Sequence, residues 1–132
     1  MDTNIRKTLI KVIGEFPEIK LAVLFGSLAR GTQRDDSDVD IAVASERPLP
    51  SERRLRLLEA LAISLGRPVD LVDLKTAGYF VMKQALIHGE IVLCTDRSVL
   101  AEVGKRLVFE REDFAPYVRR TLRERRRAWI GM

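Results

Sequence analysis

The spacing of apolar residues predicts helices and strands that alternate along the chain. Residues 3–16 carry apolar side chains near helical spacing, and Pro17 ends that helix: Ile5, Leu9, Val12, Ile13 and Phe16. The apolar run IKLAVLF over 19–25 predicts a buried strand that ends at Gly26. Three further strands are expected over 38–44, 69–74 and 90–94. Three further helices are expected, one between Ser51 and Gly66 and two over 78–88 and about 97–128.

The first of these helices has recognisable boundaries, because Ser51 is a candidate N-cap and Gly66 is its stop. The last helix is expected to break near Pro116. Helices interleaved with few strands indicate an α/β (α+β) sandwich. The connection between the first two strands is short, which favours an antiparallel pair.

The length of 132 residues suits one domain. We expect a core over about 18–95 and a C-terminal helical extension over about 97–128. No apolar run approaches the roughly 20 residues of a membrane span, and the N-terminus lacks the apolar region of a signal peptide. Cys94 is the only cysteine, so the sequence contains no internal disulfide and favours a reducing cytoplasm.

The net charge of +4 is unevenly distributed. Between Lys105 and Arg127 there are nine Lys or Arg and only four acidic residues. Such a segment indicates an acidic partner. Only Tyr117 and Trp129 interleave with these charges, so a protein partner is favoured over RNA, with RNA binding kept as the weaker alternative.

Two acidic residues open the strand expected over 38–44. Asp38 and Asp40 are two positions apart, so their side chains lie on one face with Cα atoms roughly 6.6 Å apart. Strands disfavour Asp, and two carboxylates on one face repel each other, so a cation would offset the cost. Paired carboxylates can hold divalent ions about 3.5–4 Å apart, the arrangement used in nucleotidyl transfer.

A small turn precedes this pair. Gly26 allows a backbone to approach a ligand closely, and Ser27 stands at the start of a short helical turn. The N-terminus of a helix binds phosphate well, and Arg30 lies one turn further along. Gly26, Ser27 and Arg30 are therefore candidate nucleotide-binding residues, although Arg30 could equally form an ion pair with Asp35 or Asp36.

The combined pattern is Gly-Ser, ten residues, then Asp-x-Asp, in the fuller form GSLARG followed by SDVD. It resembles the nucleotidyltransferases of the DNA polymerase β superfamily, in particular the minimal nucleotidyltransferases (MNT). Many of these are antitoxins paired with a HEPN-type ribonuclease toxin. The resemblance implies a small mixed sheet backed by helices. It also implies two Mg²⁺ ions held by Asp38 and Asp40, with ATP or another nucleoside triphosphate as substrate.

A third carboxylate is expected from the strand over 69–74. Asp70 and Asp73 fall on opposite faces of that strand, so only one can join Asp38 and Asp40, and parity alone does not choose between them. The family resemblance favours Asp70, as the carboxylate that holds the second metal and helps to deprotonate the acceptor. Asp73 is then an acid at the end of the strand.

The function implied by the resemblance is Mg²⁺-dependent transfer of AMP, or another nucleotide monophosphate, to a hydroxyl. The acceptor would be a tyrosine of a cognate HEPN toxin, so that modification silences the toxin. One alternative is an antitoxin that binds and masks the toxin without catalysis. Another is a nucleotidyltransferase for a small molecule of the aminoglycoside type, for which a homo-oligomer would have to complete the substrate pocket.

Overall fold

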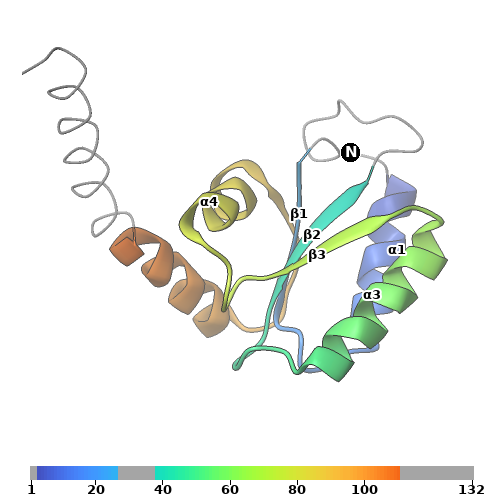
Figure 1. Cartoon of the computed structure of the whole chain (residues 1–132), viewed down its shortest axis with the longest axis horizontal. Coiled ribbons are helices and arrows are strands. Elements are labelled where there is room, and N and C mark those ends of the chain that lie inside the picture. The colour runs from blue at the N-terminus through green and yellow to red at the C-terminus, as the bar shows by residue number, and fades with distance from the viewer. Residues whose placement is uncertain (1–2, 27–37, 111–132) are drawn as a thin grey trace, which may run out of the picture.

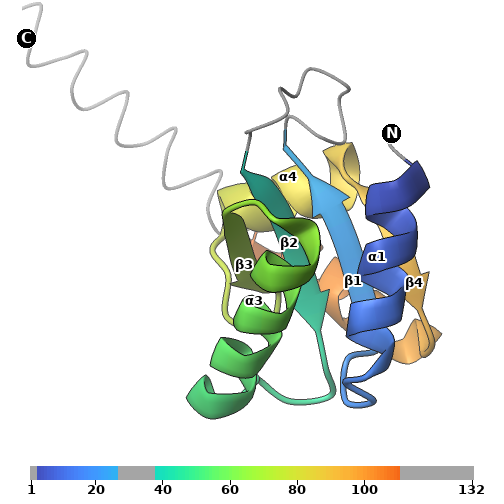
Figure 2. The ribbon, with the colours of Figure 1, turned by 90° about the vertical axis from the view of Figure 1, so that its right-hand side faces the viewer.

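A computed structural model describes residues 3–26 and 38–110. Its centre is a four-stranded sheet in the order β3-β2-β1-β4 (Figure 2). The strands are β1 (Leu21–Phe25), β2 (Val39–Ala44), β3 (Val69–Asp73) and β4 (Glu90–Cys94). β1 pairs antiparallel with both β2 and β4, whereas β2 pairs parallel with β3. The mixed sheet and the antiparallel first pair predicted from the sequence are confirmed.

Helices cover both faces of the sheet. α1 (Thr3–Gly14) and α3 (Ser51–Leu65) lie on one face, and α4 (Tyr79–His88) and a helix over 97–110 lie on the other (Figure 1). The alternation of side chains along each strand explains this arrangement. On β2, Ile41 and Val43 pack with α1 and α3, while Ala42 and Ala44 pack with α4 and the helix over 97–110.

The ends of α3 correct one expectation from the sequence. Gly66 ends the helix in the left-handed conformation (φ 66°), as predicted. Ser51 is not the N-cap, because it is the first helical residue and Pro50 occupies the cap position. Pro50 has no side-chain hydrogen-bond acceptor, so the residue at the cap position makes no side-chain cap hydrogen bond.

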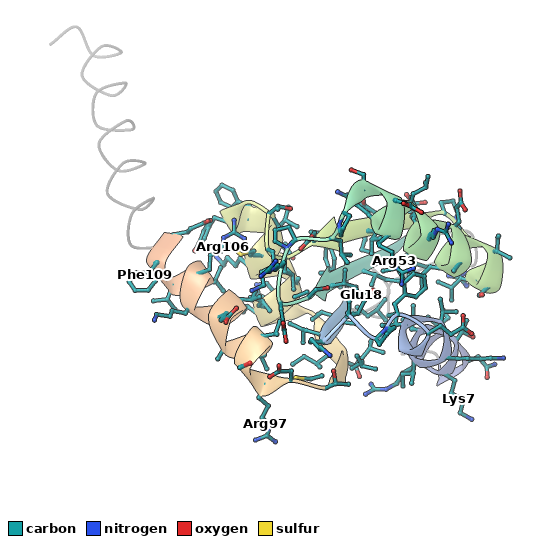
Figure 3. The ribbon with its side chains drawn as sticks, turned by 90° about the horizontal axis from the view of Figure 1, so that it is seen from below. Lys7, Glu18, Arg53, Arg97, Arg106 and Phe109 are labelled. Atoms are coloured by element: carbon teal, nitrogen blue, oxygen red, sulfur yellow. The ribbon has the colours of Figure 1, made fainter. Side chains whose placement is uncertain are left out.

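Arg106, part of the predicted basic segment, serves the fold. Its guanidinium donates to the carbonyl oxygens of Leu74 at 2.7 Å and Ala77 at 2.6 Å, and it contacts the Met82 sulfur at 3.3 Å (Figure 3). These bonds tie the helix over 97–110 to the segment that joins β3 to α4. The basic residues from Arg111 onward, and the expected break near Pro116, lie outside the described residues.

Asp73 is buried at the end of β3 and accepts hydrogen bonds from the loops on either side of it. One carboxylate oxygen accepts the Leu49 N–H at 2.8 Å, and the other accepts the Lys75 N–H at 2.9 Å. The first bond holds the loop between β2 and α3, and the second forms a turn two residues further on. Asp73 is therefore a structural residue.

The helix over 97–110 begins at a capping residue. The Asp96 carboxylate accepts the backbone N–H of Ser98 at 2.9 Å and the Ser98 hydroxyl at 2.6 Å. The hydroxyl bond, the N–H bond and the charge of Lys20 together lower the pKa of Asp96 below its usual 3.8.

Within residues 3–26 and 38–110, no helix has the length and apolar character needed to cross a membrane.

We expect Asp73→Ala to lower the free energy of unfolding by about 2–4 kcal/mol, because it leaves two backbone N–H groups without their acceptor. Asp73→Asn retains one carbonyl acceptor and should lose roughly half as much. Urea denaturation monitored by circular dichroism measures both. A loss below about 0.5 kcal/mol for the alanine variant, the range of an ordinary surface substitution, would show that these bonds are not needed.

We expect the stability that Asp96 contributes to depend on pH. Its pKa is lower in the folded chain than in the unfolded chain, so the contribution is complete above the ordinary value of 3.8 and is lost as the pH falls below it. The melting temperature of Asp96→Ala should therefore lie further below that of the wild type at pH 7 than at pH 3. A difference that is the same at both pH values would contradict this assignment. Asp96→Asn is the control that keeps a capping side chain without the charge.

Candidate active site

Two of the predicted metal ligands are neighbours across the parallel pair of strands. Asp40 of β2 is the registered partner of Asp70 of β3. Paired residues on adjacent strands point to the same face, and the strands lie about 4.8 Å apart. Asp40 is half-buried, whereas Asp70 is exposed. The sheet therefore presents two carboxylates side by side on the face that α4 covers further along.

Asp38 lies at the edge of this pair. It precedes the first residue of β2 and is exposed, so the strand begins one residue later than expected from the sequence. The start of β2 is fixed by the Val39 N–H, which donates to the Pro68 carbonyl oxygen at 2.9 Å. This bond fixes Asp38 two positions before Asp40, beside the segment at Pro68 that leads into β3.

The sequence pattern left open whether Asp70 or Asp73 lies beside Asp40, and the structure shows that it is Asp70. Asp73 is registered with Val43, whose side chain packs toward α1 and α3. Asp40 and Asp70 belong to the opposite face. Asp73 is also occupied as the acceptor for Leu49 and Lys75. It therefore does not join Asp40, and its place at the end of the strand agrees with the prediction.

Gly26 is in close contact with Asp40. Phe25, the last residue of β1, is registered with Asp40, and Gly26 follows with φ +75°. A Cβ atom at Gly26 would collide with a carboxylate oxygen of Asp40 and lie 3.1 Å from its Cγ. Both the backbone conformation and the contact require glycine here. The other predicted nucleotide-binding residues, Ser27 and Arg30, lie outside the described residues.

The side chains at this edge are of the chemical type that binds a magnesium ion. Carboxylate oxygens are the ligands that Mg²⁺ prefers, and two adjacent carboxylates repel each other unless a cation lies near them. Among residues 3–26 and 38–110, no three His, Cys, Asp or Glu side chains converge as one group of ligands. The pair Asp40–Asp70, with Asp38 beside it, is thus what the structure brings together, and ligation by all three stays a prediction.

The sequence pattern missed two contacts, one at this edge and one at the other end of β3. The role of Gly26 as a neighbour of Asp40 depends on the pairing of β1 with β2, which the motif itself does not encode. The role of Asp73 had a local signal, since an Asp that accepts the N–H two residues later is a common turn. Its second bond, to Leu49, spans 24 residues and has no such signal.

Comparison with known proteins places this site in a family. The model of the family "Polymerase beta, Nucleotidyltransferase" matches residues 7–98. The protein adenylyltransferase MntA of Shewanella oneidensis is 39% identical over 83 residues, which is 62% of this chain and 60% of that protein. The match thus spans less than two thirds of the length of that relative.

Solved structures give the same result over more of the chain. A toxin–antitoxin crystal structure with AMP-PNP aligns with a TM-score of 0.65 and 31% identity, covering 96% of this chain and 95% of the other. A structure of a tri-AMPylated HEPN toxin from Shewanella oneidensis in complex with its MNT antitoxin aligns with a TM-score of 0.61 and 27% identity, covering 99% and 97%. The resemblance and the fold class predicted from the sequence are confirmed. The chain belongs to the polymerase beta nucleotidyltransferase family.

Proposed function

We propose that this protein transfers AMP from ATP to a hydroxyl of a HEPN-type toxin and thereby acts as its antitoxin. The observation that carries the proposal is the registered pair Asp40–Asp70, with Asp38 two positions before Asp40 and the Gly26 backbone against the Asp40 carboxylate. The relatives support the choice of nucleotide and acceptor, since they are a protein adenylyltransferase and toxin complexes with AMP-PNP or with an AMPylated toxin.

Asp38, Asp40 and Asp70 would hold the Mg²⁺ ions. When bound, these ions supply charge that stabilises the phosphate groups in the transition state. Asp70, which is exposed, is proposed to accept the proton of the attacking hydroxyl. The hydroxyl oxygen forms a bond to the α-phosphorus, and the bond from that phosphorus to the pyrophosphate group breaks.

Gly26 gives the triphosphate room to approach the carboxylates. Glycine at this position allows the backbone to contact the Asp40 carboxylate. The N–H groups of such a turn can bind phosphate oxygens. Ser27 and Arg30 are proposed as further phosphate ligands on the strength of the sequence motif.

The acceptor on the toxin is proposed to be a tyrosine. Masking without catalysis remains the competing function, because a stable complex alone could block a toxin. A small-molecule acceptor is the second alternative. The cytoplasmic location favoured by the single cysteine is part of the proposal.

We expect Asp40→Asn to lower the rate of AMP transfer by about 100-fold or more, comparable to removing one electrostatic group at a reacting centre. The test is the intact mass of the co-purifying partner before and after addition of ATP and Mg²⁺, where the wild type should add one or more AMP units. Glu59→Gln is the matched control, because Glu59 is an exposed acid on α3 over the opposite face of the sheet. An Asp40→Asn variant that still protects cells from the toxin as well as the wild type would overturn the proposal in favour of masking.

We expect Gly26→Ala to reduce AMP transfer at least about 10-fold, because the new Cβ displaces the Asp40 carboxylate from the reacting centre. Gly66→Ala separates this effect from backbone strain. Gly66 also has a positive φ (+66°), but nothing lies within 4 Å of its Cβ position.

Both glycine substitutions should lower the free energy of unfolding by about 1–2 kcal/mol, the cost of the left-handed conformation in an L-residue. Only Gly26→Ala should lose activity. Equal activities of the two variants, at a temperature where both are folded, would show that the contact with Asp40 has no catalytic role.

A further inference from the structure

The helix α4 carries apolar side chains on the side that points away from the sheet. Met82 and Ala85 face inward and are buried against β1. Phe80 and Ile87 lie about two helical turns apart on the opposite side, and they are 65% and 57% exposed. We call the exposed side chains on this side the α4 outer face: Phe80, Lys83, Gln84 and Ile87.

α4 lacks the polar outer side of an ordinary surface helix. Its sequence, YFVMKQALIH, has one lysine and no acidic residue. α3, on the other side of the sheet in Figure 1, differs because its exposed side carries the ion pair Glu52–Arg56 and the exposed Glu59. A helix that is apolar on both sides is typical of a buried position. The composition of α4 therefore indicates a face that another molecule covers.

The α4 outer face leads to the edge of the sheet that carries the candidate metal ligands. Ile87 belongs to the last turn of α4, and this turn lies against the end of β1. A Cβ atom at Gly89, directly after the helix, would lie 3.0 Å from the carbonyl oxygen of Leu24. Gly26, two positions further along, is the residue whose Cβ would collide with the Asp40 carboxylate. A molecule that covers Ile87 is therefore close to the carboxylates.

The charge of the α4 outer face favours an acidic partner over a second copy of this chain. Lys83 is exposed and forms no ion pair within 4.0 Å in residues 3–26 and 38–110. In a symmetric dimer the same face would meet itself. Two copies of Lys83 would then approach each other with no acid on either α4 to separate them, and like charges repel.

We propose that the α4 outer face docks the protein whose hydroxyl receives AMP. The inference rests on the function proposed above, since the occupant is the HEPN-type toxin. Phe80 and Ile87 contact an apolar patch on the toxin, and Lys83 pairs with an acidic side chain at the border of that patch. Docking there places the toxin beside Asp40 and Asp70, where the acceptor hydroxyl can reach the α-phosphorus.

The test is a titration of this protein with the HEPN-type toxin that co-purifies with it, without ATP, so that binding is measured apart from transfer. We expect Phe80→Ala and Ile87→Ala each to raise the Kd at least about 10-fold, as for central apolar residues of an interface. Lys83→Glu should also raise the Kd, and more at low salt than at high salt, because the ion pair is screened.

Ile63→Ala is the matched control. Ile63 is 82% exposed on α3, on the opposite face of the sheet, and it stands one turn from the exposed Glu59. This variant should bind the toxin as the wild type does. The substituted side chains are exposed, so all of these variants should melt close to the wild type.

AMP transfer separates docking from chemistry. Phe80→Ala and Ile87→Ala should raise the toxin concentration that gives half the maximal rate, with little change in the rate at saturating toxin. Asp40→Asn should do the reverse, since it removes a carboxylate from the reacting centre but leaves the α4 outer face intact.

Toxin affinity that is unchanged in both Phe80→Ala and Ile87→Ala would refute the docking surface, while AMP transfer by the wild type would still support the proposed function. A toxin that binds this face but never gains AMP would do the opposite. If the substitutions instead dissociate a homodimer and spare toxin binding, the face belongs to a contact between copies and the inference is wrong. If no toxin co-purifies, both proposals fail.

Discussion

The alignment of β2 on β3 is the constraint on which the rest of the structure depends. The Val39 N–H bonds to the Pro68 carbonyl at one end, at 2.9 Å, and the Leu74 N–H bonds to the Val43 carbonyl at the other, at 2.8 Å. Between them Asp40 is registered with Asp70. A slip of one residue would turn β3 over, so that Asp70 faced the apolar side under α1 and α3 and Asp73 lost its partners.

The sheet separates apolar packing from charge along its strands. β2 is buried at every position except the half-buried Asp40. Polar groups therefore lie at the two ends of β2. Asp38, Asp40 and Gly26 lie at one end, and Ser45 and Lys20 lie at the other. The buried strand β2 between them fixes the distance between these two ends.

Several charged residues that a sequence reader would assign to binding maintain the fold instead. Asp73 closes two loops, Asp96 caps a helix, and Arg106 anchors that helix to the segment after β3. Arg106 belongs to the basic segment from which an acidic partner was predicted, so its charge is used within the chain. Chemical type alone cannot separate these residues from Asp40, because their roles depend on what lies beside them.

The sequence by itself determined the family, the order of the elements and the carboxylates to consider, because the motif spacing and the periodicity of apolar residues are local. It located every described strand to within two residues and the C-terminal end of α3, but it placed the start of α3 one residue late by assigning Ser51 as the cap. Only the tertiary structure decided between Asp70 and Asp73, showed that Asp40 needs a glycine beside it, and buried the Ser45 hydroxyl without a hydrogen-bond partner in the described part of the chain. These outcomes follow from strand register and from contacts between distant segments, which no local pattern encodes.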